Sequence, residues 1–256
     1  MPNDKIVCYL YTVFDPKKKL IDFINNYKKY KPGLNHKLVI CLKLLNINEI
    51  NKIRKYLKNT KYIEFIDPEK KNDWDFGSYK RISEKFYNKD VLFLNSHSYP
   101  VCNNWLKKLF VHKNKENVIA TTSSYESLVD SVKLKNKFHK IIRYIKRKYH
   151  FSLNFNKFPN PHFRTTGFLI NSKIFLTYIK NKKLEYKEDA LKIESGKNGL
   201  TNYLKNGIEN FRCCQSTAAF KKLNLRAQTL KQTFQRCIIY HKLCLAFRSR
   251  KPLKFC

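Results

Sequence analysis

The chain has 256 residues, 43% of them hydrophobic, and its 53 Lys and Arg outnumber its 19 Asp and Glu, for a formal net charge of +34. This length is enough for one α/β domain with a sizeable core or for two small domains, and the hydrophobic content argues against an intrinsically disordered chain. No apolar run approaches the roughly 20 residues that span a bilayer, and residues 1–10 lack the pattern of a signal peptide, so a cytoplasmic protein is expected.

Strand-like and helix-like segments alternate through the first half of the chain. The apolar, β-rich segments are 5–13, 37–45, 62–66 and 91–94, and the helical segments between them run from about 15 to 30, 46 to 58 and 77 to 87. Asp15 and Pro16 predict a capping residue and a first-turn proline for the first helix. Ile47, Ile50, Ile53 and Leu57 predict one apolar face for the second. The alternation predicts an α/β fold with a Rossmann-type, mostly parallel sheet flanked by helices.

The second half continues the pattern. Strands are expected at 117–121 and 165–170, helices at 104–110, 136–150, near 172–180 and at 187–192, a loop at 151–163, and a last assignable segment at 199–205. The helix at 136–150 is basic and amphipathic, and its apolar face carries Phe138, Ile141, Ile142, Ile145 and Tyr149. Such a helix either packs this face on its own domain or lies on an anionic membrane surface.

Residues 210–256 differ in composition from the rest of the chain. They contain no Asp or Glu, 11 Lys and Arg, and five of the eight cysteines. One interpretation is a basic arm that binds membrane or nucleic acid. Another is a segment that is translated out of frame or disordered. The cysteine spacings match no zinc pattern, and disulfides are not expected in a cytosolic protein.

The stretch at 90–100 reads DVLFLNSHSYP, in which an apolar run leads directly into Asn95, Ser96, His97 and Ser98. A short apolar run bounded by turn-forming residues is typical of a strand buried on both faces. Open α/β sheets bind ligands in the crevice beyond the carboxyl ends of their strands. We therefore expect a binding site at this polar cluster. The alternative is a polar loop that only ends a core strand.

The segment 73–79 reads DWDFGSY and precedes an expected helix. Asp75 is expected to cap that helix, and Gly77 and Ser78 to offer backbone N–H groups to an anion at its N-terminus. Trp74 lies between two carboxylates, and a stacking ring beside an acceptor suits a nucleoside base or ribose. The alternative is an ordinary helix cap without a ligand.

Two further segments carry candidate chemistry. Residues 159–167 read PNPHFRTTG, and the prolines would present His162 and Arg164 rigidly, which suits a phosphate or a metal–phosphate group. The alternative is a structural turn with an exposed arginine. Near a later helix end, Glu188, Asp189 and Glu194 are candidates for a general base that activates a hydroxyl. The alternative is that they are solvated helix charges.

Six blocks of the sequence, taken in order, resemble a family of bacterial glycosyltransferases that act in lipopolysaccharide, capsule or rhamnan-type polysaccharide assembly. The blocks are DFGSYKRI at 75–82, DVLFLNSHSYP at 90–100, NNWLKKL at 103–109, SYESL at 124–128, PNPHFRTTGFLI at 159–170 and KEDALKIESGKNGLTNYL at 187–204. The resemblance spans residues 5–208 and implies a GT-A-like domain over 1–209. Its nucleotide-sugar half would run to about 122 and its acceptor half from about 123 to 209.

The resemblance also implies roles for the candidate residues. The expected nucleotide-binding residues are Asp75, Gly77, Ser78 and Tyr79. Asn95 and His97 occupy the place where GT-A enzymes carry Asp-x-Asp, which binds the divalent metal that holds the donor diphosphate. Because these carboxylates are absent, no metal ligand is assigned and dependence on Mg²⁺ or Mn²⁺ is left open.

The same resemblance gives His162 and Arg164 the task of neutralising the diphosphate of a nucleotide-sugar donor. It makes Glu188 or Asp189 the first choice for the general base, with Glu194 as the second choice. The acceptor would be a saccharide or a lipid-linked saccharide. The positive charge would draw in the donor and hold the enzyme at the anionic inner face of the membrane.

Two alternatives remain open at the level of sequence. The net charge and 37 aromatic residues (19 Phe, 16 Tyr, 2 Trp) also fit a polyanion-binding protein, but no nucleic-acid-binding motif is present, so no specific nucleic-acid partner is expected. A catalytically inactive relative of the glycosyltransferases is the second alternative. The absence of Gly-x-Gly-x-x-Gly, His-Glu-x-x-His and Gly-x-Ser-x-Gly disfavours dinucleotide oxidoreductases, zinc proteases and α/β-hydrolases.

Overall fold

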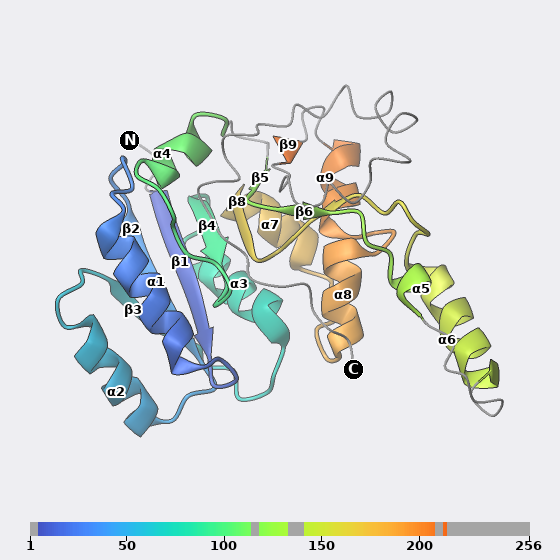
Figure 1. The fold of residues 1–256 in the computed structure, drawn as a ribbon, viewed down its shortest axis with the longest axis horizontal. Helices are drawn as coiled ribbons and strands as arrows, with labels where there is room; N and C mark the ends of the chain where they lie inside the picture. Colours follow the sequence, from blue (N-terminus) through green and yellow to red (C-terminus); the bar gives the residue numbers. More distant parts are fainter. Residues whose placement is uncertain (1–4, 114–117, 133–140, 208–211, 214–256) are drawn as a thin grey trace.

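The computed structural model describes residues 5–113, 118–132, 141–207 and 212–213. Within them a mixed sheet runs in the order β3-β2-β1-β4-β8-β5-β9 (Figure 1). The four strands of the first half are β1 (Lys5–Thr12), β2 (Lys37–Lys43), β3 (Ile63–Ile66) and β4 (Asp90–Leu94), and they are mutually parallel. The predicted α/β fold with a mostly parallel sheet flanked by helices is confirmed.

The second half adds strands of mixed direction. β8 (Gly167–Asn171) is antiparallel to both β4 and β5 (Ile119–Ala120), and β9 (Arg212–Cys213) pairs parallel with β5. A separate two-stranded ladder joins β6 (Ser123–Ser124) and β7 (His162–Phe163) antiparallel. The antiparallel insertion of β8 extends the sheet beside β4 and brings the segment that precedes β8 to the carboxyl end of β4.

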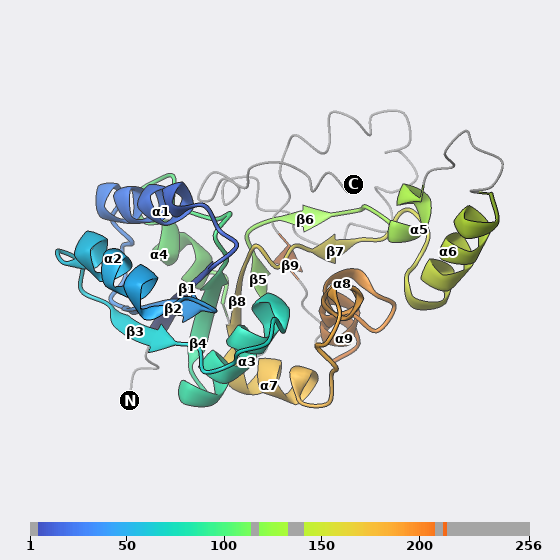
Figure 2. The same cartoon turned by 90° about the horizontal axis from the view of Figure 1, so that it is seen from below.

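Helices cover both faces of the sheet because its central strands are apolar on both sides (Figure 2). One face packs against α1 (Lys17–Lys29), α2 (Ile47–Leu57) and α4 (Trp105–Phe110). The other packs against α3 (Trp74–Lys85), α7 (Ser172–Ile179), α8 (Lys187–Ser195) and α9 (Leu200–Gly207). The two clusters together form the core of the molecule.

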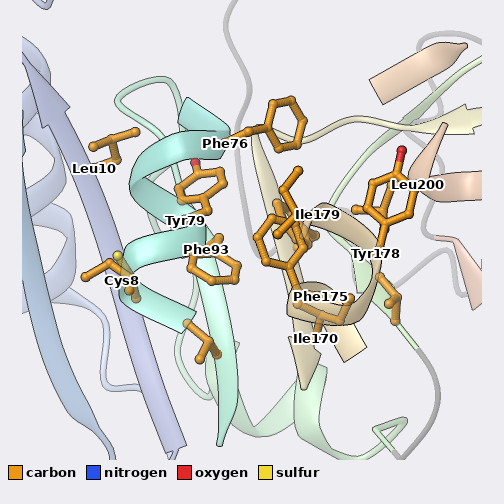
Figure 3. Packing of buried hydrophobic residues seen from close by; sticks show 14 of the residues in the cluster. Cys8, Leu10, Phe76, Tyr79, Phe93, Ile170, Phe175, Tyr178, Ile179 and Leu200 are labelled. Carbon is orange, nitrogen blue, oxygen red and sulfur yellow. The ribbon is translucent and has the colours of Figure 1, made fainter. Parts of the chain in front are cut away.

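Aromatic rings join α3, β4, β8 and α7 on the second face. The Tyr79 ring centroid lies 4.5 Å from that of Phe93, and Phe175 lies 5.6 Å from Phe93 on its other side (Figure 3). Phe168 contacts all three rings. Ring pairs at these separations stabilise a core beyond their buried area, so α3 is held firmly against β4.

A third, smaller cluster lies apart from the sheet. It joins α5 (Leu128–Ser131) to α6 (Ile141–Asn154) through Val129, Phe151 and Phe155. In both views α6 lies at the end of the molecule opposite α2 (Figures 1 and 2). No helix in the described residues is long and apolar enough to cross a membrane.

Several predicted boundaries are wrong in detail. Helix α3 begins at Trp74 and not at about 77, and α6 continues to Asn154, into the segment 151–163 that was expected to be a loop. Ile47 was expected on the apolar face of α2, but it is 59% exposed. Residues 133–140, which include Phe138, and residues 214–256 of the unusual C-terminal segment lie outside the described residues. The division into two halves at about 122 stays a prediction.

Candidate functional site

The candidate site lies where the connections from neighbouring parallel strands diverge. From β1 the chain steps outward to β2 and β3, and then returns to place β4 on the other side of β1. The connections after β1 and β4 therefore leave in different directions, and α/β sheets bind ligands in the crevice that forms at such a switch point. The polar residues that follow β1 and β4 define the site.

Asp15 links the two connections at this switch point. Its carboxylate accepts a hydrogen bond from the hydroxyl of Ser96, which follows β4. It also accepts hydrogen bonds from the backbone N–H and the hydroxyl of Thr12, at 2.9 and 2.8 Å. The prediction that Asp15 caps α1 is wrong, because Pro16 occupies the N-cap position and no side chain caps the helix. The carboxylate is held over the end of β1 instead.

Asp75 faces the same region from the first turn of α3. Its carboxylate accepts a hydrogen bond from Asn95 Nδ2 at 3.4 Å. Burial raises the pKa of Asp75 to about 6, although the Asn95 hydrogen bond opposes the rise. The negative charges of Asp15 and Glu194 add to it. A carboxyl group whose pKa is strongly raised by burial is a candidate functional residue.

A network of charges fixes the start of α3. Lys43, the last residue of β2, has a side chain only 1% exposed, and its ammonium pairs with Asp73 and donates to the carbonyl of Trp74. Arg81 donates to the carboxylates of Asp73 and Asp67, both at 2.7 Å. Burial alone would raise the pKa of Asp73, but the hydrogen bonds from Arg81 and Lys43 outweigh it and lower that pKa. The network holds Trp74 in a left-handed conformation with φ of 59°.

Gly77 leaves room for this network. A Cβ atom at position 77 would overlap the carboxylate of Asp73. The backbone N–H of Gly77 donates to the carbonyl of Asp73 at 3.2 Å, and the hydroxyl of Ser78 donates to Asp67. Because α3 begins at Trp74, the Gly77 N–H lies inside the helix and is already bonded, which does not favour the expected anion site; contact of Gly77 and Ser78 with a nucleotide stays a prediction. The expected cap by Asp75 is wrong for the same reason, because Asp73 is the N-cap.

The cation Lys19 and the imidazole of His97 form the rim of the site. Lys19 Nζ lies 2.9 Å from His97 Nδ1. Burial, together with the charge of Lys19, lowers the pKa of His97, so a neutral imidazole accepts a hydrogen bond from the ammonium. A pocket of about 170 Å³ opens beside this pair, lined by Pro16, Lys18, Lys19, Asp22, His97 and Tyr99.

Glu194 approaches from the opposite side, on α8. Its Oε1 accepts hydrogen bonds from the backbone N–H and the hydroxyl of Thr165, at 3.0 and 3.2 Å. Burial lowers the pKa of His162, and the charge of Glu194 opposes that shift. The same charge adds to the burial that raises the pKa of Asp75. Glu194 is thus within electrostatic reach of both Asp75 and His162.

The loop after β4 and the segment before β8 are tied together. The N–H of Asn95 and the hydroxyl of Ser98 both donate to the carbonyl of Thr166, at 3.1 and 2.7 Å. His162, which is 8% exposed, is held through Nδ1 by the carbonyl of Asn160 at 2.8 Å. These contacts carry the 160–166 segment from the second half of the chain to the end of the central sheet.

Glu188 and Asp189 are engaged elsewhere on α8. The carboxylate of Glu188 lies 2.8 and 2.9 Å from Nε2 of His150 on α6. Asp189 Oδ2 accepts hydrogen bonds from the backbone N–H groups of Glu185 and Tyr186, at 3.1 and 2.9 Å. Asp189 thus caps its own helix, and Glu188 bridges two helices. Neither is among the charges that act on Asp75, and their catalytic role stays a prediction.

Two other predicted residues have structural partners. Arg164 donates to Glu126 at 2.6 Å. Tyr79 is fully buried in the aromatic cluster, where burial raises the pKa of its hydroxyl. That hydroxyl has no partner in the described part of the chain. Contact of either residue with a nucleotide or a diphosphate stays a prediction.

The side chains of the site do not fit a protein-held metal ion. No group of three or more His, Cys, Asp and Glu in residues 5–113, 118–132, 141–207 and 212–213 is arranged for one. Asn95 donates to Asp75 through its amide, so its NH₂ group faces the carboxylate.

Sequence reasoning missed four residues of this region: Asp15, Lys19, Lys43 and Asp67. Lys43 ends β2, Asp67 comes directly after β3, and Asp15 follows β1. A signal was present, because a charged residue at the carboxyl end of each expected parallel strand must meet the others at one edge of the sheet. Lys19 gave no such signal, since it lies on a helix surface.

Comparisons with known proteins add structural matches only. No family model matches the chain, and no curated protein sequence matches it. GalNAc-T7, crystallised with UDP, GalNAc and Mn²⁺, is 13% identical with a TM-score of 0.46 over 79% of this chain and 40% of that chain. The glycosyltransferase GlyE of Streptococcus pneumoniae TIGR4 is 13% identical with a TM-score of 0.44 over 91% of this chain and 50% of that chain.

A third match is a putative glucose-1-phosphate thymidylyltransferase from Bacillus anthracis in complex with a sucrose, 10% identical with a TM-score of 0.46 over 88% of this chain and 95% of that chain. The chain thus spans half or less of the length of GalNAc-T7 and GlyE. Matches at these identities and scores say nothing about activity, so the function has to be inferred from the residues of the site.

Proposed function

We propose that this protein is a glycosyltransferase that binds a nucleotide-sugar at the carboxyl ends of β1 and β4. It would transfer the sugar to a saccharide or lipid-linked acceptor. The observation that carries the proposal is the meeting of Asp15, Asp75, Ser96 and Asn95 at the switch point of the sheet. This is the place where an α/β sheet of this topology binds its ligand.

The two sides of the site suit the two ends of such a donor. Asp15 and Asp75 offer carboxylate acceptors to ribose hydroxyls or to the N–H groups of a base. Lys19 and His97 at the rim offer positive charge or N–H donors to a diphosphate, since Lys is a common phosphate ligand. Both side chains line a pocket of about 170 Å³. The charge of Lys19 would then stabilise the diphosphate, as a metal ion does in other glycosyltransferases.

Glu194 is the proposed general base. It comes from the second half of the chain, where the acceptor is expected, and Thr165 fixes its carboxylate by two hydrogen bonds. Glu194 would take the proton of the acceptor hydroxyl as that oxygen bonds the anomeric carbon. The bond from that carbon to the diphosphate would break, and the nucleoside diphosphate would leave with the electron pair. His162 and Asp75 lie within reach of its charge.

The resemblance of the six sequence blocks supports a more specific proposal. The protein would act in cell-surface polysaccharide assembly, with a nucleotide-sugar half up to about residue 122 and an acceptor half over about 123–209. The electrostatic effect of Glu194 on Asp75 supports the two-halved arrangement, because Asp75 comes from one half and Glu194 from the other.

A thermal-shift screen of the full chain tests the proposal. The ligands are UDP-, GDP-, dTDP- and CMP-sugars with and without Mn²⁺, and pyrophosphate serves as a charge control because the chain is strongly basic. A ligand at 100 times its Kd stabilises by about 2.7 kcal/mol, which raises Tm by roughly 5–10 °C in a chain of this size. We expect one nucleotide class to exceed pyrophosphate clearly. Equal shifts with pyrophosphate, or none with any donor, would contradict the proposal.

A further inference from the structure

Helix α6 presents an apolar stripe to solvent. Ile142, Ile145, Tyr149 and Leu153 are 67, 58, 67 and 55% exposed. Steps of three and four residues place these side chains above one another on one face of the helix. A contiguous exposed apolar surface of this kind marks a contact with another surface, whereas single exposed apolar residues do not.

The stripe is not the face by which α6 is attached to the rest of the protein. Phe151 faces the opposite side of the helix and packs with Phe155 and Val129 in the third cluster. The N–H and the ammonium of Lys197 donate to the carbonyls of Asn154 and Ser152, at 2.8 and 2.7 Å. The helix is therefore fixed to the body through one face while the stripe points away.

Positive charge borders the stripe. Arg143, Lys146 and Arg147 are exposed, and helical geometry places them together along one side of the apolar residues. The sequence contains no Asp or Glu between Asp130 and Glu185. Two copies of such a surface would repel each other, whereas an anionic lipid surface accepts both the apolar side chains and the cations.

We propose that α6 docks the protein on an anionic lipid bilayer. The stripe would enter the boundary between headgroups and acyl chains, and the three cations would contact lipid phosphates. The position of α6 at one end of the molecule leaves it accessible to a flat surface (Figures 1 and 2). This inference does not depend on the proposed transferase activity, since lipid binding is measured without a donor or an acceptor.

Vesicle flotation of the full chain tests the proposal. Vesicles of phosphatidylcholine with about 30% phosphatidylglycerol are compared with pure phosphatidylcholine at about 0.15 and 0.5 M salt, because high salt screens exposed charges. The double variant Ile145→Ser/Tyr149→Ser removes apolar surface and no charge. We expect it to bind the anionic vesicles at least about tenfold more weakly than wild type, most clearly at high salt.

A charge-matched pair of variants separates local docking from the effect of net charge. Arg143→Glu/Lys146→Glu changes the cations beside the stripe, and Lys52→Glu/Lys55→Glu makes the same change of charge on the exposed face of α2. We expect at least a tenfold loss for the first and less than a twofold change for the second at about 0.15 M salt. Unchanged thermal unfolding verifies that each variant is folded.

Three results would overturn the proposal. The first is equal binding by wild type and Ile145→Ser/Tyr149→Ser. The second is an equal loss for the two charge variants, which would show that net charge alone binds the vesicles. The third is a dimer in solution that the serine variant converts to monomer while vesicle binding stays unchanged, which would assign the stripe to a second copy of the chain.

Discussion

The hydroxyl of Ser96 donates a hydrogen bond to the carboxylate of Asp15, and this bond joins the loop after β4 to the loop after β1. The two residues are 81 positions apart in the chain. Their contact lies at the switch point of the sheet, where the two loops would otherwise be free to separate. The bond therefore holds the walls of the proposed crevice at a fixed distance.

The first prediction concerns this bond. Ser96→Ala removes the donor while Thr12 still holds the carboxylate, so the free energy of unfolding should fall by about 1.5–3 kcal/mol, as for other hydrogen bonds to a charged group. Denaturant unfolding measures the change. Ser131→Ala is the control, because within the described part of the chain its exposed hydroxyl bonds a carbonyl of its own helix and nothing else, and it should change the value by less than about 0.5 kcal/mol. Equal effects would argue against a linking role for Ser96.

The second prediction concerns the pH dependence of Asp75. A carboxyl group whose pKa is raised to about 6 in the folded state and is about 3.9 when unfolded makes folding less favourable as pH rises between those values. Asp75→Asn removes this decrease in folding stability with rising pH. The stability of the variant relative to wild type should thus increase by on the order of 2 kcal/mol from pH 4 to pH 7.

Urea unfolding of both proteins across this pH range gives the difference directly, because the other titrating groups cancel. A difference that does not vary with pH would mean that the Asp75 carboxyl is not perturbed by its surroundings. Glu84→Gln, at an exposed position on the same helix, is the matched control for replacing a carboxylate by an amide.

The third prediction concerns Gly77. Replacing a helical glycine by alanine ordinarily stabilises a protein by up to about 1 kcal/mol. Here the added methyl group meets the carboxylate of Asp73, which Lys43 and Arg81 hold in place. We expect Gly77→Ala to lower the free energy of unfolding by about 1–3 kcal/mol, the usual cost of overpacking. Thermal or urea unfolding measures it.

The double variant Asp73→Ala/Gly77→Ala provides the check on this explanation. With the carboxylate gone, the added methyl group should no longer cost stability relative to Asp73→Ala alone. A double-mutant cycle that finds the two substitutions additive would refute the steric conflict.

The fourth prediction separates the three carboxylates of α8. Glu194→Gln should lower kcat about 10²- to 10⁴-fold, the range for loss of a general base, with little change in stability. Glu188→Gln should leave kcat within a few-fold of wild type, since its partner is His150. Asp189→Asn should mainly weaken the helix cap, at a cost of about 1 kcal/mol or less. Steady-state rates of nucleoside diphosphate release provide the measurement.

The central strands could be predicted from the sequence because each one is determined by a run of residues that are adjacent in the chain. The run Val91 to Leu94 is apolar throughout, as a strand buried on both faces requires. The polar cluster that follows it also lies where the sequence placed it, at the carboxyl end of β4. Both features depend only on residues that are neighbours in the chain.

The start of α3 could not be predicted in this way. Gly77 suggested a later beginning, but Lys43, which is 30 residues from Asp73 in the chain, fixes the first turn through a buried ion pair. The position of Glu194 could not be predicted for a similar reason. The sequence places Glu188 and Asp189 on an expected helix at 187–192 with Glu194 just after it, and only the packing of α8 decides that Glu194 is the one hydrogen-bonded to Thr165.

Equilibrium binding of the nucleotide-sugar selected by the thermal-shift screen tests the central claim most directly. Calorimetric titrations of wild type, Asp15→Asn and Glu84→Gln would be compared at about 0.15 and 0.5 M salt. We predict one donor per chain, binding that survives the higher salt, at least about tenfold weaker binding by Asp15→Asn, and no change for Glu84→Gln. Equal binding by all three proteins, or binding that disappears at the higher salt, would contradict a donor site at the switch point and would assign the affinity to net charge.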